Sequence, residues 1–148
     1  MPLIYLLLSG SALLIIYDDV REQNIHTIYL MAFMLAGVLQ QITQPEPESF
    51  WTAFVIAFIF FSCQGLFYFL KGEPAIGWGD VAIAPSCGLW LYLHELPSFL
   101  LSTGFIALCT GMIWRYRWNM RAFPLAPALL SGLGSVFLIR CFLTGNGI

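Results

Sequence analysis

Six apolar stretches, separated by short polar segments, set the strongest limit on how this chain can fold. They are residues 3–17, 28–42, 50–70, 81–93, 97–114 and 125–143. Charged residues make up only 9% of the sequence, against about 25% in a soluble domain. Lipid offers no partner to backbone groups, so an apolar span must be helical, and the alternation typical of a membrane β-barrel is absent. The pattern predicts an all-α, polytopic membrane helical bundle with about six transmembrane helices.

The lengths of these stretches limit where the polar residues lie. Several are shorter than the roughly 20 residues that cross about 30 Å of hydrocarbon. The spans must therefore extend into their polar flanks, which places Asp18, Asp19 and Asp80 at or just inside the membrane boundary. The first stretch lacks the basic start and the small-residue cleavage pattern of a secretory signal, so we expect it to be a retained span. We expect residues 1–148 to form a single transmembrane domain.

The basic residues are distributed unevenly among the polar connections. The connections at 18–27, 71–80 and 115–122 hold Arg21, Lys71, Arg115, Arg117 and Arg121. The connections at 43–49 and 94–96 hold acidic residues and no Lys or Arg. The positive-inside rule makes the basic side cytoplasmic, so we expect a multi-pass protein of the inner (cytoplasmic) membrane with both termini outward. Arg140 is the exception, and we expect it to snorkel to the outer interface.

Acidic side chains at two distant positions are the candidates for chemistry. An Asp at the centre of an inserting helix costs about 2.5–3.5 kcal/mol and is retained mostly for function. Asp18, Asp19 and Glu22 follow the first stretch and Asp80 opens the fourth, so both groups lie on the same side of the membrane. Two carboxylates that share one water can hydrolyse a peptide bond, one as base and one as acid, without a metal, cofactor or nucleophilic side chain. The alternative is a solvated interfacial cluster after the first span, with Asp80 acting only as a helix N-cap.

The segment around Asp80 carries a resemblance to a known family. Gly77-Trp78-Gly79-Asp80 resembles the G-x-G-D signature of the type IV prepilin peptidase family of intramembrane-type aspartic proteases. Asp19-Val20-Arg21, followed by Ile25, is similar to the first-aspartate segment of that family, and residues 123–127 resemble its late proline-containing segment. The order of these segments and the six-span topology match along nearly the whole chain.

The resemblance implies a function and a set of site residues. It implies that Asp19 and Asp80 are the catalytic pair, that Gly77 and Gly79 belong to the motif and substrate loop, and that Asp18 is the competitor for the first position. The implied activity removes the short basic leader of type IV prepilins or pseudopilins at the cytoplasmic face. The implied partners are that substrate, the lipid bilayer and a pilus or secretion machinery. Nucleic acid is not expected as a partner, because the few basic residues make no patch.

The sequence also departs from the family pattern. His26 stands where proline is usual, and Ala82 where many members have lysine. The large loop that carries paired zinc-binding cysteines and N-methylation activity in bifunctional members is missing, so we expect no methyl transfer. Cys63, Cys87, Cys109 and Cys141 lie inside apolar stretches without the spacing of a zinc site. A non-catalytic membrane subunit of a pilus or secretion complex, and a small ion or proton transporter, stay open as alternatives.

Overall fold

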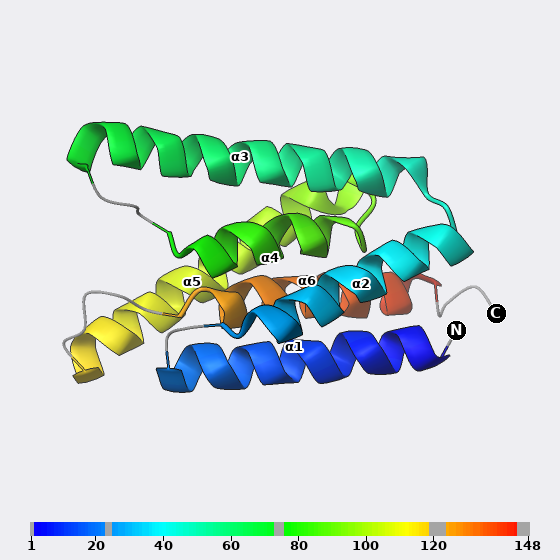
Figure 1. The fold of residues 1–148 in the computed structure, drawn as a ribbon, viewed down its shortest axis with the longest axis horizontal. Coiled ribbons are helices and arrows are strands. Elements are labelled where there is room, and N and C mark those ends of the chain that lie inside the picture. The colour runs from blue at the N-terminus through cyan, green and yellow to red at the C-terminus, as the bar shows by residue number, and fades with distance from the viewer. Residues whose placement is uncertain (1, 23–24, 73–75, 119–123, 145–148) are drawn as a thin grey trace.

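The apolar stretches of the sequence form a bundle of helices (Figure 1). The computed structural model describes residues 2–22, 25–72, 76–118 and 124–144. Within these ranges the helices are α1 (Pro2–Glu22), α2 (Thr27–Thr43), α3 (Pro47–Lys71), α4 (Trp78–Gly88), the short 3₁₀-helix η1 (Leu93–Glu95), α5 (Leu96–Trp118) and α6 (Ala126–Thr144). Each predicted stretch overlaps one α-helix, which confirms the all-α prediction.

The surface of the bundle is that of a membrane protein. Four of the described segments are long and apolar enough to cross a membrane, namely 3–22, 47–71, 93–116 and 126–143. Large apolar side chains such as Phe58 on α3 and Phe105 on α5 are exposed, as expected where lipid rather than water is the solvent. A membrane helical bundle is therefore confirmed. Crossing by α2, with 17 residues, and by α4, with 11 residues, remains a prediction.

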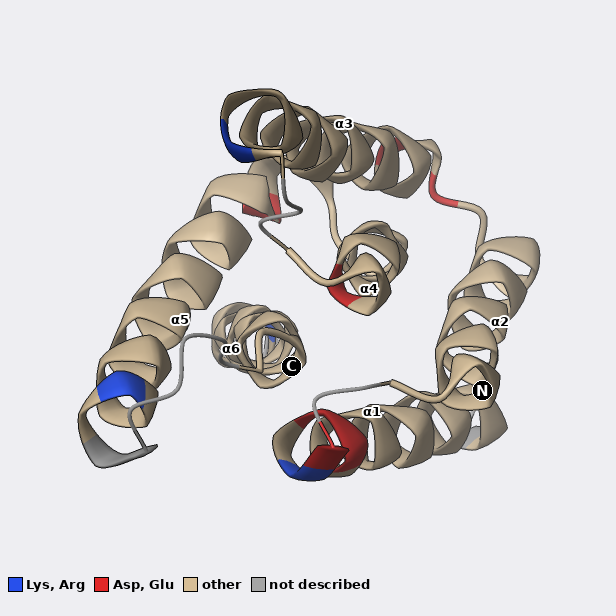
Figure 2. Cartoon of the chain, turned by 60° about the vertical axis from the view of Figure 1, so that its left-hand side comes forward, with Lys and Arg blue, Asp and Glu red and all other residues tan. Residues whose placement is uncertain are grey.

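Helices α4 and α6 lie at the centre of the bundle, with the other helices around them (Figure 2). Helix α4 packs against α2, α3 and α6, and α6 packs also against α1 and α5. The fully buried apolar side chains come from all of the α-helices and include Ile15, Phe33, Ile56, Ile83, Phe99 and Leu129. The central position of α4 carries Asp80, one of the candidate site residues, into the interior of the bundle.

The fourth helix ends earlier than its apolar stretch predicted. That stretch covers residues 81–93 and was expected to extend into its polar flank, and α4 does begin in this flank, at Trp78, but it ends at Gly88. The chain leaves the helix in a tight turn, in which the Trp90 and Leu91 N–H groups donate to the carbonyls of Cys87 and Gly88. Side chains from other helices bind the carbonyls that follow, because Gln41 donates to Leu89 O and Arg140 donates to Trp90 O. These tertiary bonds replace the bonds of a longer helix.

Basic residues lie at the ends of α1, α3 and α5, and acidic residues accompany them at the end of α1 (Figure 2). The ends of α1, α3 and α5 that carry Arg21, Lys71 and Arg115 lie together, at the left in Figure 1. The starts of α3 and α5, which directly follow Glu46 and Glu95 in the sequence, lie toward the opposite end (Figure 1). Arg121 of the predicted cytoplasmic connection and Phe123 of the proline-containing segment lie outside the described residues. We call the end with Lys71 the basic end and the opposite one the far end.

Candidate active site

Asp19 connects the last turn of α1 to the first residue of α6. Its side chain is 5% exposed, and its Oδ2 accepts a hydrogen bond of 3.0 Å from the backbone N–H of Ala126. The first N–H groups of a helix have no partner inside the helix, so Asp19 satisfies one that α6 would otherwise leave unpaired. Pro127 occupies the first turn of α6, where a missing N–H costs nothing.

Asp80 lies in the first turn of α4 at the same end of the bundle. The helix N-cap is Gly77, so Asp80 is not the cap residue that the alternative interpretation required. Asp80 is 9% exposed and interacts electrostatically with Asp19 and with the Ala126 N–H. Among the described residues its Oδ1 has no hydrogen-bond partner. The bundle thus brings Asp19 and Asp80, which are far apart in the sequence, to one place at the start of α6.

The two motif glycines provide room for side chains at this place. A Cβ on Gly77 would lie 3.3 Å from Asp80 Oδ2, and a Cβ on Gly79 would lie 3.0 Å from Ile25 Cδ1. Gly77 has φ −62° and ψ 142°, which any residue can adopt. These glycines are therefore needed for close approach rather than for an unusual backbone conformation. Ile25, just after the first-aspartate segment, packs directly on the first turn of α4, which carries Asp80.

Asp18 has different neighbours from Asp19. Its Oδ2 lies 3.9 Å from His26 Nε2, which is also 4.0 Å from Glu22 Oε2. Adjacent helical residues are about 100° apart around the axis, so the two carboxylates point in different directions. The position of proline in the family pattern is therefore taken by a histidine that faces Asp18 and Glu22. Arg21 donates a hydrogen bond to the Tyr17 hydroxyl at 2.6 Å.

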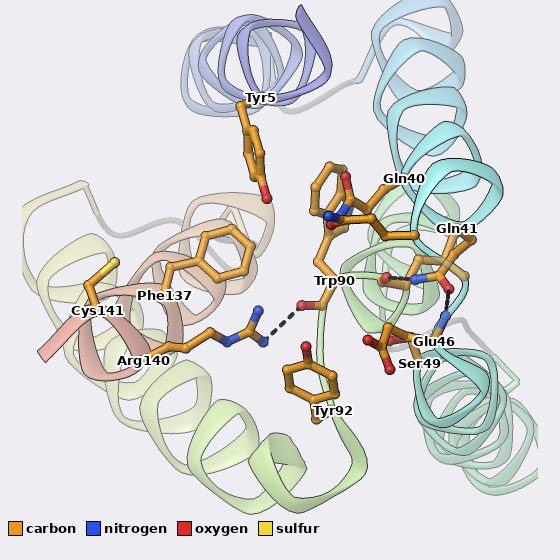
Figure 3. Close-up of a pocket in the computed structure, with 12 residues that line it drawn as sticks. Tyr5, Gln40, Gln41, Glu46, Ser49, Trp90, Tyr92, Phe137, Arg140 and Cys141 are labelled. Carbon is orange, nitrogen blue, oxygen red and sulfur yellow. Dashed lines mark hydrogen bonds between the residues drawn. The ribbon is translucent and has the colours of Figure 1, made fainter. Parts of the chain in front are cut away.

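A cavity of about 400 Å³ lies at the far end of the bundle (Figure 3). Arg140 of α6 forms an ion pair with Glu95 there and donates a hydrogen bond to the Trp90 carbonyl. Its guanidinium lies over the Tyr92 ring at 4.6 Å. The snorkelling of Arg140 to the outer interface stays a prediction, and the structure adds that a carboxylate and a carbonyl of the protein bind this side chain. The residues that line the cavity include neither Asp19 nor Asp80.

The described part of the chain holds no group of three or more His, Cys, Asp or Glu side chains that could bind a metal ion. Cys87 is buried in α4, while Cys63, Cys109 and Cys141 are exposed on separate helices.

Fold and charge placement together define a class: a polytopic membrane protein in which carboxylates from two helices meet at the start of a third. The chain belongs to the type IV leader peptidase family, whose model matches residues 6–112. This confirms the family to which the Gly77–Asp80 segment pointed, and the matched range includes both aspartates.

Curated relatives agree with this membership. The chain is similar to the prepilin leader peptidase/N-methyltransferase of Burkholderia pseudomallei (strain 1026b), with 29% identity over 82 residues, 53% of this chain and 26% of the relative. Identity to the protein of the same name from Haemophilus influenzae is 26% over 95 residues, 64% of this chain and 40% of the relative. Identity to the protein of the same name from Pectobacterium carotovorum subsp. carotovorum is 33% over 72 residues, which are 48% of this chain and 26% of the relative. The matches thus span 26% to 40% of the relatives' length. No solved structure matches the chain.

Proposed function

We propose that this protein is an aspartic endopeptidase that removes the short basic leader of type IV prepilins or pseudopilins. The observation that carries the proposal is the meeting of Asp19 and Asp80 at the N-terminus of α6. Family membership supports the substrate class, since the curated relatives are named prepilin leader peptidases.

The chemistry follows from two carboxylates close to one water molecule. Like charges at short distance disfavour double ionisation, so one group keeps a proton while the other is a base. The ionised carboxylate takes a proton from the attacking water, and the protonated one donates a hydrogen bond to the developing oxyanion and then a proton to the leaving amine. The Asp80 Oδ1, which has no hydrogen-bond partner in the described ranges, is available for such a water.

The distribution of charge supports cleavage at the cytoplasmic face. Asp19 is in the last turn of α1 and Asp80 in the first turn of α4, and both of these helix ends lie at the basic end of the bundle (Figure 1). Under the positive-inside rule that end faces the cytoplasm, and both termini of the chain face outward. An apolar helix of the substrate would then lie in the bilayer, with its leader in the cytoplasm beside the aspartates.

The test is a cleavage assay in membranes from cells that co-express the chain with a prepilin carrying a short basic leader. Wild type is expected to shorten the prepilin. Asp19→Asn and Asp80→Asn are each expected to lower the rate by about 10²–10⁴-fold, the usual contribution of a general acid or base. Asp18→Asn is the matched control, because this buried neighbour faces His26 instead, and it should cleave at close to the wild-type rate.

The outcomes separate the proposal from its alternatives. Processing by either the Asp19 or the Asp80 variant at the wild-type rate removes that residue from the pair. A wild-type chain that folds in the membrane but leaves the prepilin uncut would instead favour a non-catalytic subunit.

A further inference from the structure

Gln64 is a buried polar side chain in the C-terminal half of an apolar helix. It lies on α3 and is 5% exposed. Its Nε2 donates to the carbonyl oxygen of Ile76 at 2.9 Å, and its Oε1 accepts from the Ile76 N–H at 3.0 Å. A buried amide is costly unless it is hydrogen-bonded. Here one side chain satisfies both backbone groups of a single residue, in the manner of a neighbouring β-strand.

The residue that Gln64 holds leads directly into the first turn of α4. Ile76 precedes Gly77, the N-cap of α4. The Gly77 carbonyl accepts from the Val81 N–H at 3.1 Å and so closes the turn that contains Asp80. A hydrogen-bonded helical turn is rigid, so the direction of the Asp80 side chain depends on where Ile76 is fixed. Gln64 on α3 therefore bonds the residue that directly precedes the N-cap of the helix carrying Asp80.

We propose that Gln64 is a positioning residue, which fixes the start of α4 so that the Asp80 carboxylate is held against Asp19 for peptide hydrolysis. The inference rests on the proposed function, and it adds a residue that acts through Asp80 rather than on the substrate. The simpler interpretation is that Gln64 only stabilises the packing of α3 on α4. The two interpretations differ in whether turnover depends on this glutamine more than stability does.

The far end of the bundle offers a matched control. Gln41 of α2 is also 5% exposed. Its Nε2 donates to the Leu89 carbonyl at 2.6 Å, and its Oε1 accepts from the Glu46 N–H at 3.1 Å. Gln41 therefore makes the same kind of contacts as Gln64, but where α4 ends rather than where it begins. Replacing either glutamine by leucine removes one donor bond and one acceptor bond to backbone.

The first experiment compares the kinetics and stability of Gln64→Leu and Gln41→Leu in the full chain, purified in detergent, with a prepilin substrate. Both variants should lose similar stability. Only Gln64→Leu should lower kcat, by about ten- to a hundredfold, because a misplacement of about 1 Å has that effect, with KM unchanged. Gln64→Asn, whose amide is one methylene too short to reach Ile76, should lower kcat in the same way and serves if the leucine variant does not fold.

Three results would overturn the proposal. They are an equal fall in kcat for Gln64→Leu and Gln41→Leu, an unchanged kcat for the Gln64 variants, and a change confined to KM.

The second measurement does not depend on cleavage. Amide hydrogen exchange over residues 76–81 should be faster in Gln64→Leu than in wild type and unchanged in Gln41→Leu, since the Ile76 N–H loses its acceptor only in the first. Equal exchange in wild type and Gln64→Leu would overturn the inference even if the enzyme cleaves prepilin. If instead the exchange changes as expected and wild type cleaves nothing, the proposed function is refuted, while the role of Gln64 in fixing α4 stands.

Discussion

Gly88, at the end of α4, is the position where a single methyl group should disturb the bundle most. A Cβ built there would lie 2.5 Å from Ala53 Cα, 2.8 Å from Ala53 N and 3.1 Å from Ala53 Cβ. The first two of these atoms belong to the backbone of α3, so no rotamer change can relieve the overlap. Non-bonded carbon atoms are comfortable at about 3.5–4.0 Å, so α3 and α4 would have to separate locally by roughly 1 Å.

The expected size of the effect follows from two opposed contributions. Overpacking a well-packed interior costs about 1–3 kcal/mol, while replacing glycine by alanine inside a helix gains about 0.5–1 kcal/mol. Gly88→Ala should therefore lower the free energy of unfolding by up to about 2.5 kcal/mol. Gly10→Ala in α1 is the matched control, because nothing lies within 4 Å of its added Cβ, and it should raise stability by about 0.5–1 kcal/mol.

The measurement is the unfolding of both variants and wild type in the same detergent, followed by the loss of helical circular dichroism. The expected order of stability is Gly10→Ala, wild type, Gly88→Ala. If the two variants shift in the same direction by the same amount, the close approach of α3 and α4 at Gly88 is not the determinant of packing that the distances imply.

Three further substitutions test other parts of the structure. Gly77→Ala places a Cβ 3.3 Å from Asp80 Oδ2, so it should lower kcat several-fold in the prepilin assay. The free energy of unfolding should stay within about 0.5 kcal/mol of wild type. A normal kcat would show that Asp80 tolerates displacement. Glu95→Gln removes the carboxylate that faces Arg140 and should destabilise the bundle in detergent by about 2 kcal/mol. This is less than the roughly 3–5 kcal/mol lost when a fully buried pair is broken, because the Arg140 side chain is 31% exposed. Unchanged stability would refute a structural role for this pair. His26→Ala removes a side chain that is 60% exposed, and kcat should stay within about twofold of wild type; a larger loss would give His26 a part in the chemistry.

The helices and the shared location of the acidic groups were predictable for physical reasons. Apolar stretches in lipid have few alternatives to helix, and an even number of spans between Asp19 and Asp80 returns the chain to the same side of the membrane. The spacing within the first-aspartate segment also favoured Asp19 over Asp18. In the structure Asp19 is the one of the two that reaches the start of α6.

The polar contacts between helices could not be predicted from local sequence. Nothing around Gln64 indicates that its partner is Ile76, and nothing around Arg140 indicates that its partner is Glu95, 45 residues away. The early end of α4 also depends on contacts with other helices. Leu89 and Trp90 continue an apolar run in the sequence, but in the structure their carbonyls accept hydrogen bonds from the side chains of Gln41 and Arg140, so the helix can end there. Such contacts depend on how helices are arranged in space, which hydropathy does not encode.

The bond from Asp19 to Ala126 is made to the main chain, and this affects how the site can change over evolutionary time. Every amino acid except proline supplies the same N–H, so mutation of codon 126 to another small residue, such as glycine or serine, would preserve this anchor. Drift at this position is limited by the space around a fully buried methyl group, not by the identity of a hydrogen-bonding side chain. A proposed acid or base held in this way needs no co-varying partner at position 126, so correlated substitutions between related chains would fail to reveal the contact.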